Sequence, residues 1–341
     1  MNQHIQNIEI SNFKSIKDLK IDGCKKINIF AGKPNAGKSN ILEAISMLRL
    51  DIIEDDFREY LRFKNYDDLT YFGNIENNIN ITSNLGFIDF EAFELFGISY
   101  LIGNKENMFK INIDDENYIN IFHGEERGFP KNYKPFDYNI LLYKHKEYIN
   151  KKFFYNKRLN VFGRNLGEII YKESTLNQKK LFDTIAKLVP ENFKIKIDSN
   201  NYELTVSKEI TPFVEYSLPY SMIAETLQRL IFYKAAIITN NDSVLLFEEP
   251  EAHCFEPYIL EFTNEVKYNE NNNQFFMVTH SDFIIQEFLR DEESKDNLQI
   301  YLVNNVDGKT EVKKLDKLNN DEVYEYGMNV FFNFDNLWEN N

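Results

Sequence analysis

Residues 32–39 read GKPNAGKS and match the phosphate-loop pattern G-x-x-x-x-G-K-[ST] at every position. In such a loop, two glycines allow the backbone to wrap closely around phosphate groups, with successive N–H groups pointing inward. The residues on either side of the loop fit this interpretation. Residues 26–31 (KINIFA) form the apolar run of a buried strand, and residues 39–48 (SNILEAISML) have apolar residues at helical spacing. Strand, loop and helix in this order predict an α/β fold with an anion site at the helix N-terminus.

Two side chains of the loop carry the expected chemistry. Lys38 would reach the β- and γ-phosphates of a nucleoside triphosphate, and the Ser39 hydroxyl would ligate Mg²⁺. The alternative is a glycine-bearing turn without a ligand. We expect the nucleotide to contact the whole loop and the residue that follows it, namely Gly32, Lys33, Pro34, Asn35, Ala36, Gly37, Lys38, Ser39 and Asn40.

A second apolar run ends in acidic residues. Residues 243–247 (SVLLF) have the length of a strand and lead into Glu248, Glu249, Pro250 and Glu251. Carboxylates at the carboxyl end of a central strand lie where an α/β sheet binds its ligand. Glu248 is therefore expected to hold Mg²⁺ through water, and Glu249 to polarise the attacking water as a general base. The alternative is a solvated acidic loop.

A third apolar run, residues 274–278 (QFFMV), precedes Thr279, His280 and Ser281. A lone histidine is more often structural than catalytic. His280, however, follows the strand that comes next after the acidic strand, and this position suits a sensor of the γ-phosphate. The candidate catalytic residues are thus Glu249, His280 and Lys38.

These motifs resemble those of the ABC-type ATPases of the SMC/RecF/OLD group, often labelled AAA family ATPases. Residues 8–16 (IEISNFKSI) are similar to the first strand and turn of that group, and the resemblance covers about 1–50 and 215–305. It implies an α/β P-loop ATPase head with a mixed central sheet flanked by helices, plus an inserted α+β lobe. It also implies ATP and Mg²⁺ as cofactors, and a head-to-tail homodimer or higher assembly with ATP sandwiched between protomers.

The resemblance places a signature motif at residues 221–229 (SMIAETLQR), opening the helix before the acidic strand. Ser221 and Glu225 would then contact the ATP held by the phosphate loop of the other protomer. The chain departs from the family at Thr226, where a glycine usually allows close approach of the backbone to the γ-phosphate.

The family has a glutamine after the phosphate loop that contacts Mg²⁺, and this sequence has no glutamine in the corresponding region. The sequence contains no glutamine between Gln6 and Gln178, and Arg62 is a guess for its substitute. We therefore expect competent ATP binding with slow hydrolysis.

The expected domains are two parts of the ATPase head, 1–55 and 213–305, separated by an inserted lobe, 56–212, and followed by a tail, 306–341. Within the lobe, alternation over 78–122 predicts an antiparallel meander. The lobe also contains a predicted helix at 176–188 and a predicted hairpin of 193–198 with 202–207, and the tail is expected to be a short strand pair followed by a loose acidic end. No heptad pattern persists, so no long coiled coil is expected.

The net charge of −15, from 39 basic and 54 acidic residues, opposes generic DNA binding. One segment, residues 141–164, runs against this balance because aromatic residues alternate with its basic ones. Such a segment suits single-stranded nucleic acid or an acidic protein partner. The alternative, which we favour, is an amphipathic helix with a solvated cationic face. The basic residues are Lys144, Lys146, Lys151, Lys152, Lys157, Arg158 and Arg164.

Further features of the sequence bear on the cellular compartment in which the protein is expected. No run of eighteen apolar residues exists, and the first residues lack the layout of a secretion signal. Cys24 and Cys254 fit no metal-binding spacing and are typical of a reducing environment. We therefore expect a cytoplasmic protein that makes no use of a membrane.

The OLD-type relatives carry a TOPRIM nuclease after the ATPase, whereas residues 281–341 are too few for that domain and contain no D-x-D. The effector is thus expected to be a separate polypeptide, such as a nuclease or toxin. This arrangement resembles the ATPase subunits of bacterial anti-phage systems such as PARIS, Septu and related retron modules. A RecF-like DNA-repair ATPase that clamps DNA directly is the alternative, and a transporter ATPase is a weaker third.

Overall fold

The computed structural model describes residues 4–48, 61–93, 97–103, 108–113, 119–123, 126–127, 139–146, 158–175, 179–316 and 322–341. Its centre is a six-stranded sheet in the order β10-β14-β15-β3-β16-β17. Every neighbouring pair is parallel except β16 with β17, which form an antiparallel hairpin. The strands are β3 (Ile27–Gly32), β10 (Asn139–Tyr143), β14 (Ser243–Glu248), β15 (Gln274–Val278), β16 (Leu298–Val306) and β17 (Lys309–Lys314).

Side chains of the central strands alternate between two hydrophobic clusters, one on each face of the sheet. On β15, for example, Phe276 and Val278 join one cluster, and Phe275 and Met277 join the other. Because both faces are covered, these strands read as continuous apolar runs in the sequence. Helix α1 (Lys38–Met47) packs in the first cluster, and the second holds α3 (Leu166–Thr175), α4 (Lys179–Ala186), α5 (Glu225–Ile238), α6 (Glu256–Lys267) and α7 (Asp282–Leu289).

The first cluster also takes in side chains of β1, β2, β4 and β5. These strands belong to an antiparallel sheet of eight strands, in the order β2-β1-β4-β5-β6-β7-β8-β9. The meander expected over 78–122 is confirmed, and it adds to the N-terminal hairpin through pairing of β4 with β1. The strands are β1 (Asn7–Phe13), β2 (Ile16–Asp22), β4 (Ile79–Ser83), β5 (Phe87–Phe93), β6 (Gly97–Gly103), β7 (Met108–Ile113), β8 (Ile119–His123) and β9 (Glu126–Arg127).

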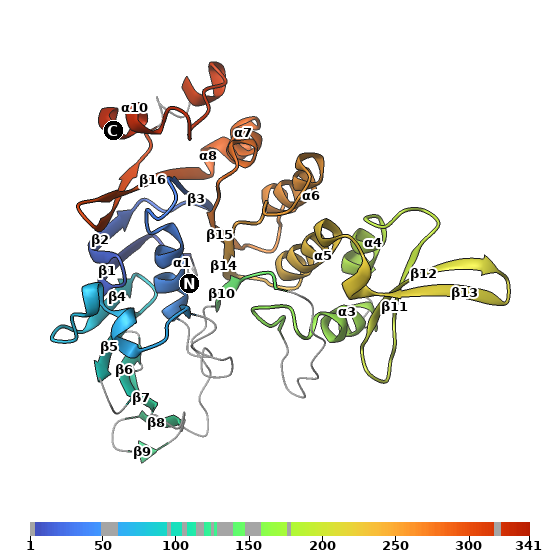
Figure 1. The fold of residues 1–341 in the computed structure, drawn as a ribbon, viewed down its shortest axis with the longest axis horizontal. Coiled ribbons are helices and arrows are strands. Elements are labelled where there is room, and N and C mark those ends of the chain that lie inside the picture. The colour runs from blue at the N-terminus through green and yellow to red at the C-terminus, as the bar shows by residue number, and fades with distance from the viewer. Residues whose placement is uncertain are drawn as a thin grey trace.

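A third sheet, β11-β12-β13, projects away from the central sheet beyond α5 and α3 (Figure 1). Its first two strands, β11 (Lys194–Ile197) and β12 (Leu204–Thr211), form the predicted hairpin. The sequence analysis missed β13 (Val214–Pro219), which pairs with β12 around a turn that holds Phe213 almost fully exposed.

Short helices connect or follow these elements. They are η2 (Tyr66–Leu69), η3 (Tyr71–Gly73), η4 (Tyr220–Met222), α8 (Glu292–Asp296) and α10 (Phe334–Asn340). No helix among the described residues is both long enough and apolar enough to cross a membrane.

The C-terminal end is more ordered than the sequence indicated. Instead of a loose acidic end, α10 packs on the head by burying Phe334 and Leu337 in the second cluster. Lys33 of the phosphate loop forms an ion pair with Asp335, with Nζ 2.5 Å from Oδ1, and lies over the Phe334 ring. The end of the chain therefore contacts the phosphate loop directly.

The basic segment 141–164 does not begin as an amphipathic helix. Asn139–Tyr143 is β10, an edge strand of the central sheet, so part of the predicted lobe returns to the head. Tyr143 is buried in the second cluster because it lies on that face of the strand. Lys146 and Arg164 lie over the ring of Phe162. Lys151, Lys152 and Lys157 lie outside the described residues.

Candidate active site

The phosphate loop joins β3 to α1, and its two glycines are required by their surroundings. A Cβ on Gly32 would lie 2.0 Å from the carbonyl oxygen of Val303 on the neighbouring strand. Gly37 has φ of 93°, and a Cβ there would lie 1.9 Å from the hydroxyl of Thr310. Glycine alone accommodates both the close approach and the left-handed conformation.

The side chain of Lys38 folds back onto the first residues of the phosphate loop. Its Nζ donates to the carbonyl oxygens of Gly32, at 2.8 Å, and Lys33, at 2.7 Å. Burial lowers the pKa of Lys38 to about 8, although the charges of Glu249 and Glu251 act in the opposite direction. The ammonium is therefore poised to exchange neutral carbonyl partners for phosphate oxygens, which bind a cation more strongly.

Glu248 ends β14, and its carboxylate faces Ser39. Burial would raise the pKa of Glu248, but the charges of Lys144 and Arg62 and hydrogen bonds from Ser39 and Lys144 outweigh it, so this pKa is lowered. The carboxylate is therefore ionised at neutral pH. A hydroxyl beside an ionised carboxylate is an oxygen-donor pair of the kind that Mg²⁺ prefers.

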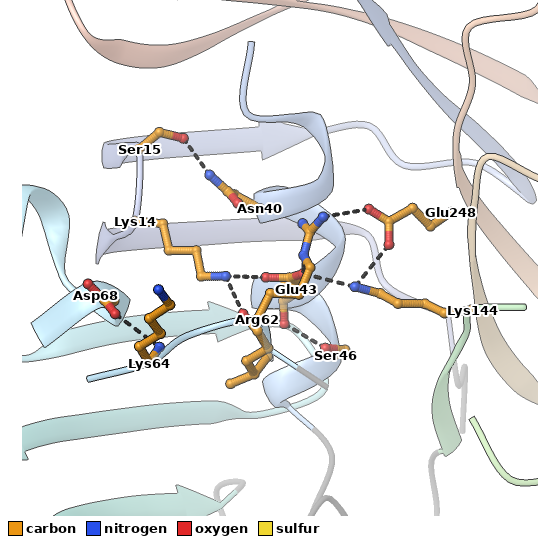
Figure 2. A network of polar contacts seen from close by, with 11 residues as sticks. Lys14, Ser15, Asn40, Glu43, Ser46, Arg62, Lys64, Asp68, Lys144 and Glu248 are labelled. Carbon is orange, nitrogen blue, oxygen red and sulfur yellow. Dashed lines mark hydrogen bonds and ion pairs between the residues drawn. The ribbon is translucent and has the colours of Figure 1, made fainter. Parts of the chain in front are cut away.

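A network of ion pairs surrounds Glu248 (Figure 2). Lys144 Nζ lies 2.9 Å from Glu248 Oε2 and 2.9 Å from Glu43 Oε1. Arg62 spans the same two acids, with Nε 2.5 Å from Glu43 and Nη1 3.4 Å from Glu248. Lys14 completes the set, with Nζ 2.5 Å from Glu43 Oε2. Glu43 has no exposed side-chain surface, so its charge depends on these three cations.

Arg62, the guess for a substitute of the Mg²⁺-contacting glutamine, lies 3.4 Å from Glu248, but Lys144 is the closer partner of that carboxylate at 2.9 Å. The sequence analysis had grouped Lys144 with a surface segment for nucleic acid or a solvated helix. Neither describes its side chain, which is only 10% exposed and points into the site. The apolar run 139–143 directly before Lys144 was the available signal for a buried strand.

Glu249 and His280 follow adjacent parallel strands. His280 Nε2 lies 3.5 Å from Glu249 Oε1, and both side chains are partly exposed. Burial and the nearby charge of Lys38 lower the pKa of His280, against the opposing effect of Glu249. The imidazole is therefore neutral at pH 7.

Glu251 is a further residue of this edge that the sequence analysis did not select. Its Oε1 accepts a hydrogen bond from the backbone N–H of His280 at 2.6 Å. Burial raises the pKa of Glu251 more than its hydrogen bonds lower it. The carboxyl group thus ties the acidic loop to the loop that carries His280.

The residues expected to form a signature motif lie in η4 and at the start of α5, whereas the phosphate loop leads into α1. Ser221 is exposed within η4, before α5 rather than in it, because α5 begins at Glu225. Glu225 pairs with Arg229 and approaches His253 at 3.6 Å. The hydroxyl of Thr226, at the position of the usual glycine, donates to the carbonyl of His253 at 2.9 Å. This bond fixes the start of α5 against the acidic loop.

The residues present fit a magnesium nucleotide. Helix α1 has Gly37 at its N-cap and therefore no capping side chain, which leaves its N-terminus open to an anion such as phosphate. An open cavity of about 610 Å³ lies beside Asn40, the residue after the loop. The remaining residues of its lining are Lys14, Arg62, Asp67, Asp68, Thr70, Phe72 and Gly73.

The fold is similar to that of an SMC head, an α/β fold with a mixed central sheet flanked by helices, as predicted. The SMC head solved in complex with the C-terminal winged-helix domain of ScpA matches with a TM-score of 0.50 and 15% identity, over 92% of this chain and 98% of that one. This match shows a shared fold, with a mixed central sheet flanked by helices. None of the protein-family models matches the chain.

Curated proteins match over one short stretch each. An ATP/GTP phosphatase from Helicobacter pylori is 57% identical over 44 residues, 13% of this chain and 12% of that protein. The DNA replication and repair protein RecF from Lactococcus lactis is 48% identical over 46 residues, 14% of this chain and 13% of RecF. The chain therefore matches only about an eighth of the length of these relatives.

Proposed function

We propose that the chain is an ATP-hydrolysing nucleotide switch. The observation that carries this proposal is the convergence of the three predicted motifs at one edge of the central sheet. Lys38 and Ser39 follow β3, Glu248 ends β14 and Glu249 comes directly after it, and His280 follows β15. A phosphate-binding loop beside an ionised carboxylate and an acid–histidine pair is the set of groups that phosphoryl transfer to water requires.

In the proposed reaction, Lys38 and the N–H groups at the N-terminus of α1 bind the β- and γ-phosphates. Ser39 and Glu248 would hold Mg²⁺, which supplies charge neutralisation on the transferred phosphoryl group when bound. Glu249 accepts a proton from the attacking water, since its carboxylate is partly exposed at the same edge. His280, being neutral, donates a hydrogen bond to the γ-phosphate without adding charge.

The nucleotide is proposed to be sandwiched between two copies of the chain. Ser221 and Glu225 are exposed, and they lie where a second protomer could approach them. In the head-to-tail arrangement, each would contact the ATP bound by the partner's loop. Thr226 already bonds within its own chain, so it holds the signature segment in place rather than contacting nucleotide.

At the level of the cell, we propose a sensor and scaffold subunit of a bacterial anti-phage system that holds a separate effector, such as a nuclease. The projecting sheet supports a role in docking because Phe213, Val214 and Tyr216 are all more than half exposed. Clustered exposed apolar side chains are typical of a surface that binds another protein. The SMC head that shares the fold was itself solved bound to a domain of ScpA.

Native mass spectrometry tests this proposal on the chain expressed with its neighbouring genes. The experiment compares the wild type with Glu249→Gln in the presence of ATP. An ATP-dependent multimer that carries a second polypeptide is the expected result. A bare chain that neither binds ATP nor associates would refute the switch, and an ATP-bound dimer without a companion would refute the scaffold role.

The alternative is a RecF-like ATPase that clamps DNA, and the short match to RecF favours it. The burial of Lys144 in the nucleotide site removes one basic residue from the surface that such a clamp would use. The test is salt-dependent DNA binding by the wild type and by the double variant Lys151→Glu, Lys152→Glu. Strong binding that the double variant loses would support the clamp, whereas negligible binding by both proteins would count against it.

A further inference from the structure

We propose that Lys144 is a cation for the γ-phosphate of ATP, supplied by the same chain that binds the nucleotide. In the structure, its ammonium bridges Glu43 and Glu248 (Figure 2). With nucleotide, it passes from Glu248 to a γ-phosphate oxygen while Glu43 continues to hold it. This inference rests on the proposed ATPase function and assigns that site a further residue.

The register of the sheet brings Lys144 to the reacting edge. Strands β10 and β14 are parallel neighbours, with Tyr143 opposite Phe247, so Lys144 and Glu248 both come one residue later. The carboxyl ends of parallel strands meet at one edge, where the phosphate loop also lies. Lys144 is thus on the same edge as Lys38 and Ser39, although a long stretch of sequence separates them.

The charges of the network favour an additional anion. Two carboxylates, Glu43 and Glu248, share three cations, Lys14, Arg62 and Lys144. Within these ion pairs the cations outnumber the carboxylates by one, and the charge of Glu249 also acts on Arg62. Lys14 pairs with Glu43 alone, whereas Arg62 and Lys144 reach both acids. Arg62 and Lys144 are thus the two cations of the cluster that face Glu248.

Metal binding would release Lys144 from its second partner. Glu248 and Ser39 would be the oxygen donors to Mg²⁺, and a Glu248 oxygen that binds the metal would be less available to the Lys144 ammonium. A buried ammonium that loses a charged partner is destabilised unless a new acceptor replaces it. A γ-phosphate oxygen is such an acceptor, and it forms a stronger hydrogen bond because both groups are charged.

The fixed position of Lys144 suits this exchange. Its side chain is 10% exposed, and Glu43, which has no exposed surface, anchors the ammonium from α1 directly behind the phosphate loop. A preorganised charge in a site from which water is largely excluded stabilises the transferred phosphoryl group without reorganisation. A merely structural Lys144 would neutralise the two acids and would not distinguish nucleotides that differ in the γ-phosphate.

The test compares ATP with ADP. Dissociation constants are measured with Mg²⁺ by titration of a fluorescent nucleotide, in a Glu249→Gln background to prevent hydrolysis and at concentrations that keep the chain monomeric. Lys144→Gln keeps a polar group but removes the charge, and Lys144→Met keeps the volume of the stem. Both are expected to weaken ATP binding about tenfold or more, the range for a charged hydrogen bond, and to leave ADP binding unchanged.

Lys20→Gln is the matched control because Lys20 is 61% exposed on β2 and pairs only with Glu9 in the described contacts. It should change neither affinity, and thermal melting identifies any variant that is unfolded. Equal losses for ATP and ADP, or no loss for either, would overturn the assignment of Lys144. If the parent protein binds neither nucleotide, the proposed ATPase function itself fails, which is a distinct result.

Discussion

Glu249 Oε1 lies 3.5 Å from His280 Nε2, and the two residues follow adjacent parallel strands of the central sheet. The backbone supports this approach. The N–H of Glu249 donates to the carbonyl of Val278 at 2.9 Å, and Glu249 itself has φ of 47° in the left-handed region. An uncommon backbone conformation at this position directs the carboxylate toward the histidine and the phosphate loop.

Glu249→Gln should leave ATP binding intact and slow hydrolysis about 10²- to 10⁴-fold, the usual contribution of a general base. The amide keeps the shape of the side chain but cannot accept a proton from water. A phosphate-release assay measures the rate of hydrolysis, and size-exclusion chromatography in the presence of ATP measures dimerisation. We expect the ATP-bound dimer of the variant to persist. Hydrolysis at the wild-type rate would move the base elsewhere, with His280 the next candidate.

Nucleotide binding should depend on pH through Lys38. Its pKa is lowered to about 8, so the ammonium is present at pH 7 and is largely lost at pH 9 in the free protein. Phosphate favours the charged form, so binding at pH 9 should take up a proton and weaken relative to pH 7. Calorimetry in two buffers of different ionisation enthalpy measures this uptake.

Lys38→Ala is the control for that experiment. It should abolish ATP binding, because it removes the group that contacts the β- and γ-phosphates. Tight binding by this variant would mean that Lys38 does not hold the phosphates. Binding by the wild type with no proton uptake at pH 9 would mean that the pKa of Lys38 is not lowered.

Gly37→Ala should destabilise the phosphate loop. A Cβ at φ of 93° is strained by about 1–2 kcal/mol, and it would also overlap the hydroxyls of Thr310 and Ser15. Gly73→Ala is the matched control, since Gly73 has φ of 71° with nothing within 4 Å of the added carbon. Chemical denaturation should show the larger loss for Gly37→Ala, together with loss of ATP binding. Equal losses would indicate that only the dihedral angle matters.

Phe334→Ala should lower the free energy of unfolding by about 3–5 kcal/mol, the cost of truncating a buried phenylalanine. The ring is 1% exposed and lies under Lys33 of the phosphate loop. Phe332→Ala, two residues earlier, removes a ring that is 91% exposed and should stay within about 0.5 kcal/mol of the wild type. Urea denaturation measures the free energy of unfolding of the two variants. Similarly small losses of unfolding free energy for both variants would mean that α10 does not pack on the head.

Much of the head was predictable because its signals are local. The loop 32–39 needs glycines at fixed spacing, and the strands that precede Glu248 and His280 are continuous apolar runs with chemistry at their ends. Period-two alternation in the same way predicted the meander and the hairpin of β11 with β12.

The Glu43 network was not predictable by such means. Its members come from the β1–β2 turn, α1, the chain after it, β10 and β14, and no local pattern relates them. Lys144 belongs by sequence to a basic, aromatic segment, and only the pairing of β10 with β14 brings it to Glu248. The α10 helix was missed for a similar reason. It has few apolar residues, and they are buried only because they pack on the second cluster.

The sequence by itself thus determined the class of fold and the residues of the phosphate loop, the acidic strand and the histidine. Each of these is encoded by spacing along a single stretch of chain. Only the tertiary structure decided which cations face Glu248, what Thr226 bonds, and that the C-terminal helix contacts Lys33. These relationships join residues far apart in the chain, and they arise from strand order and from the need of buried charges for partners.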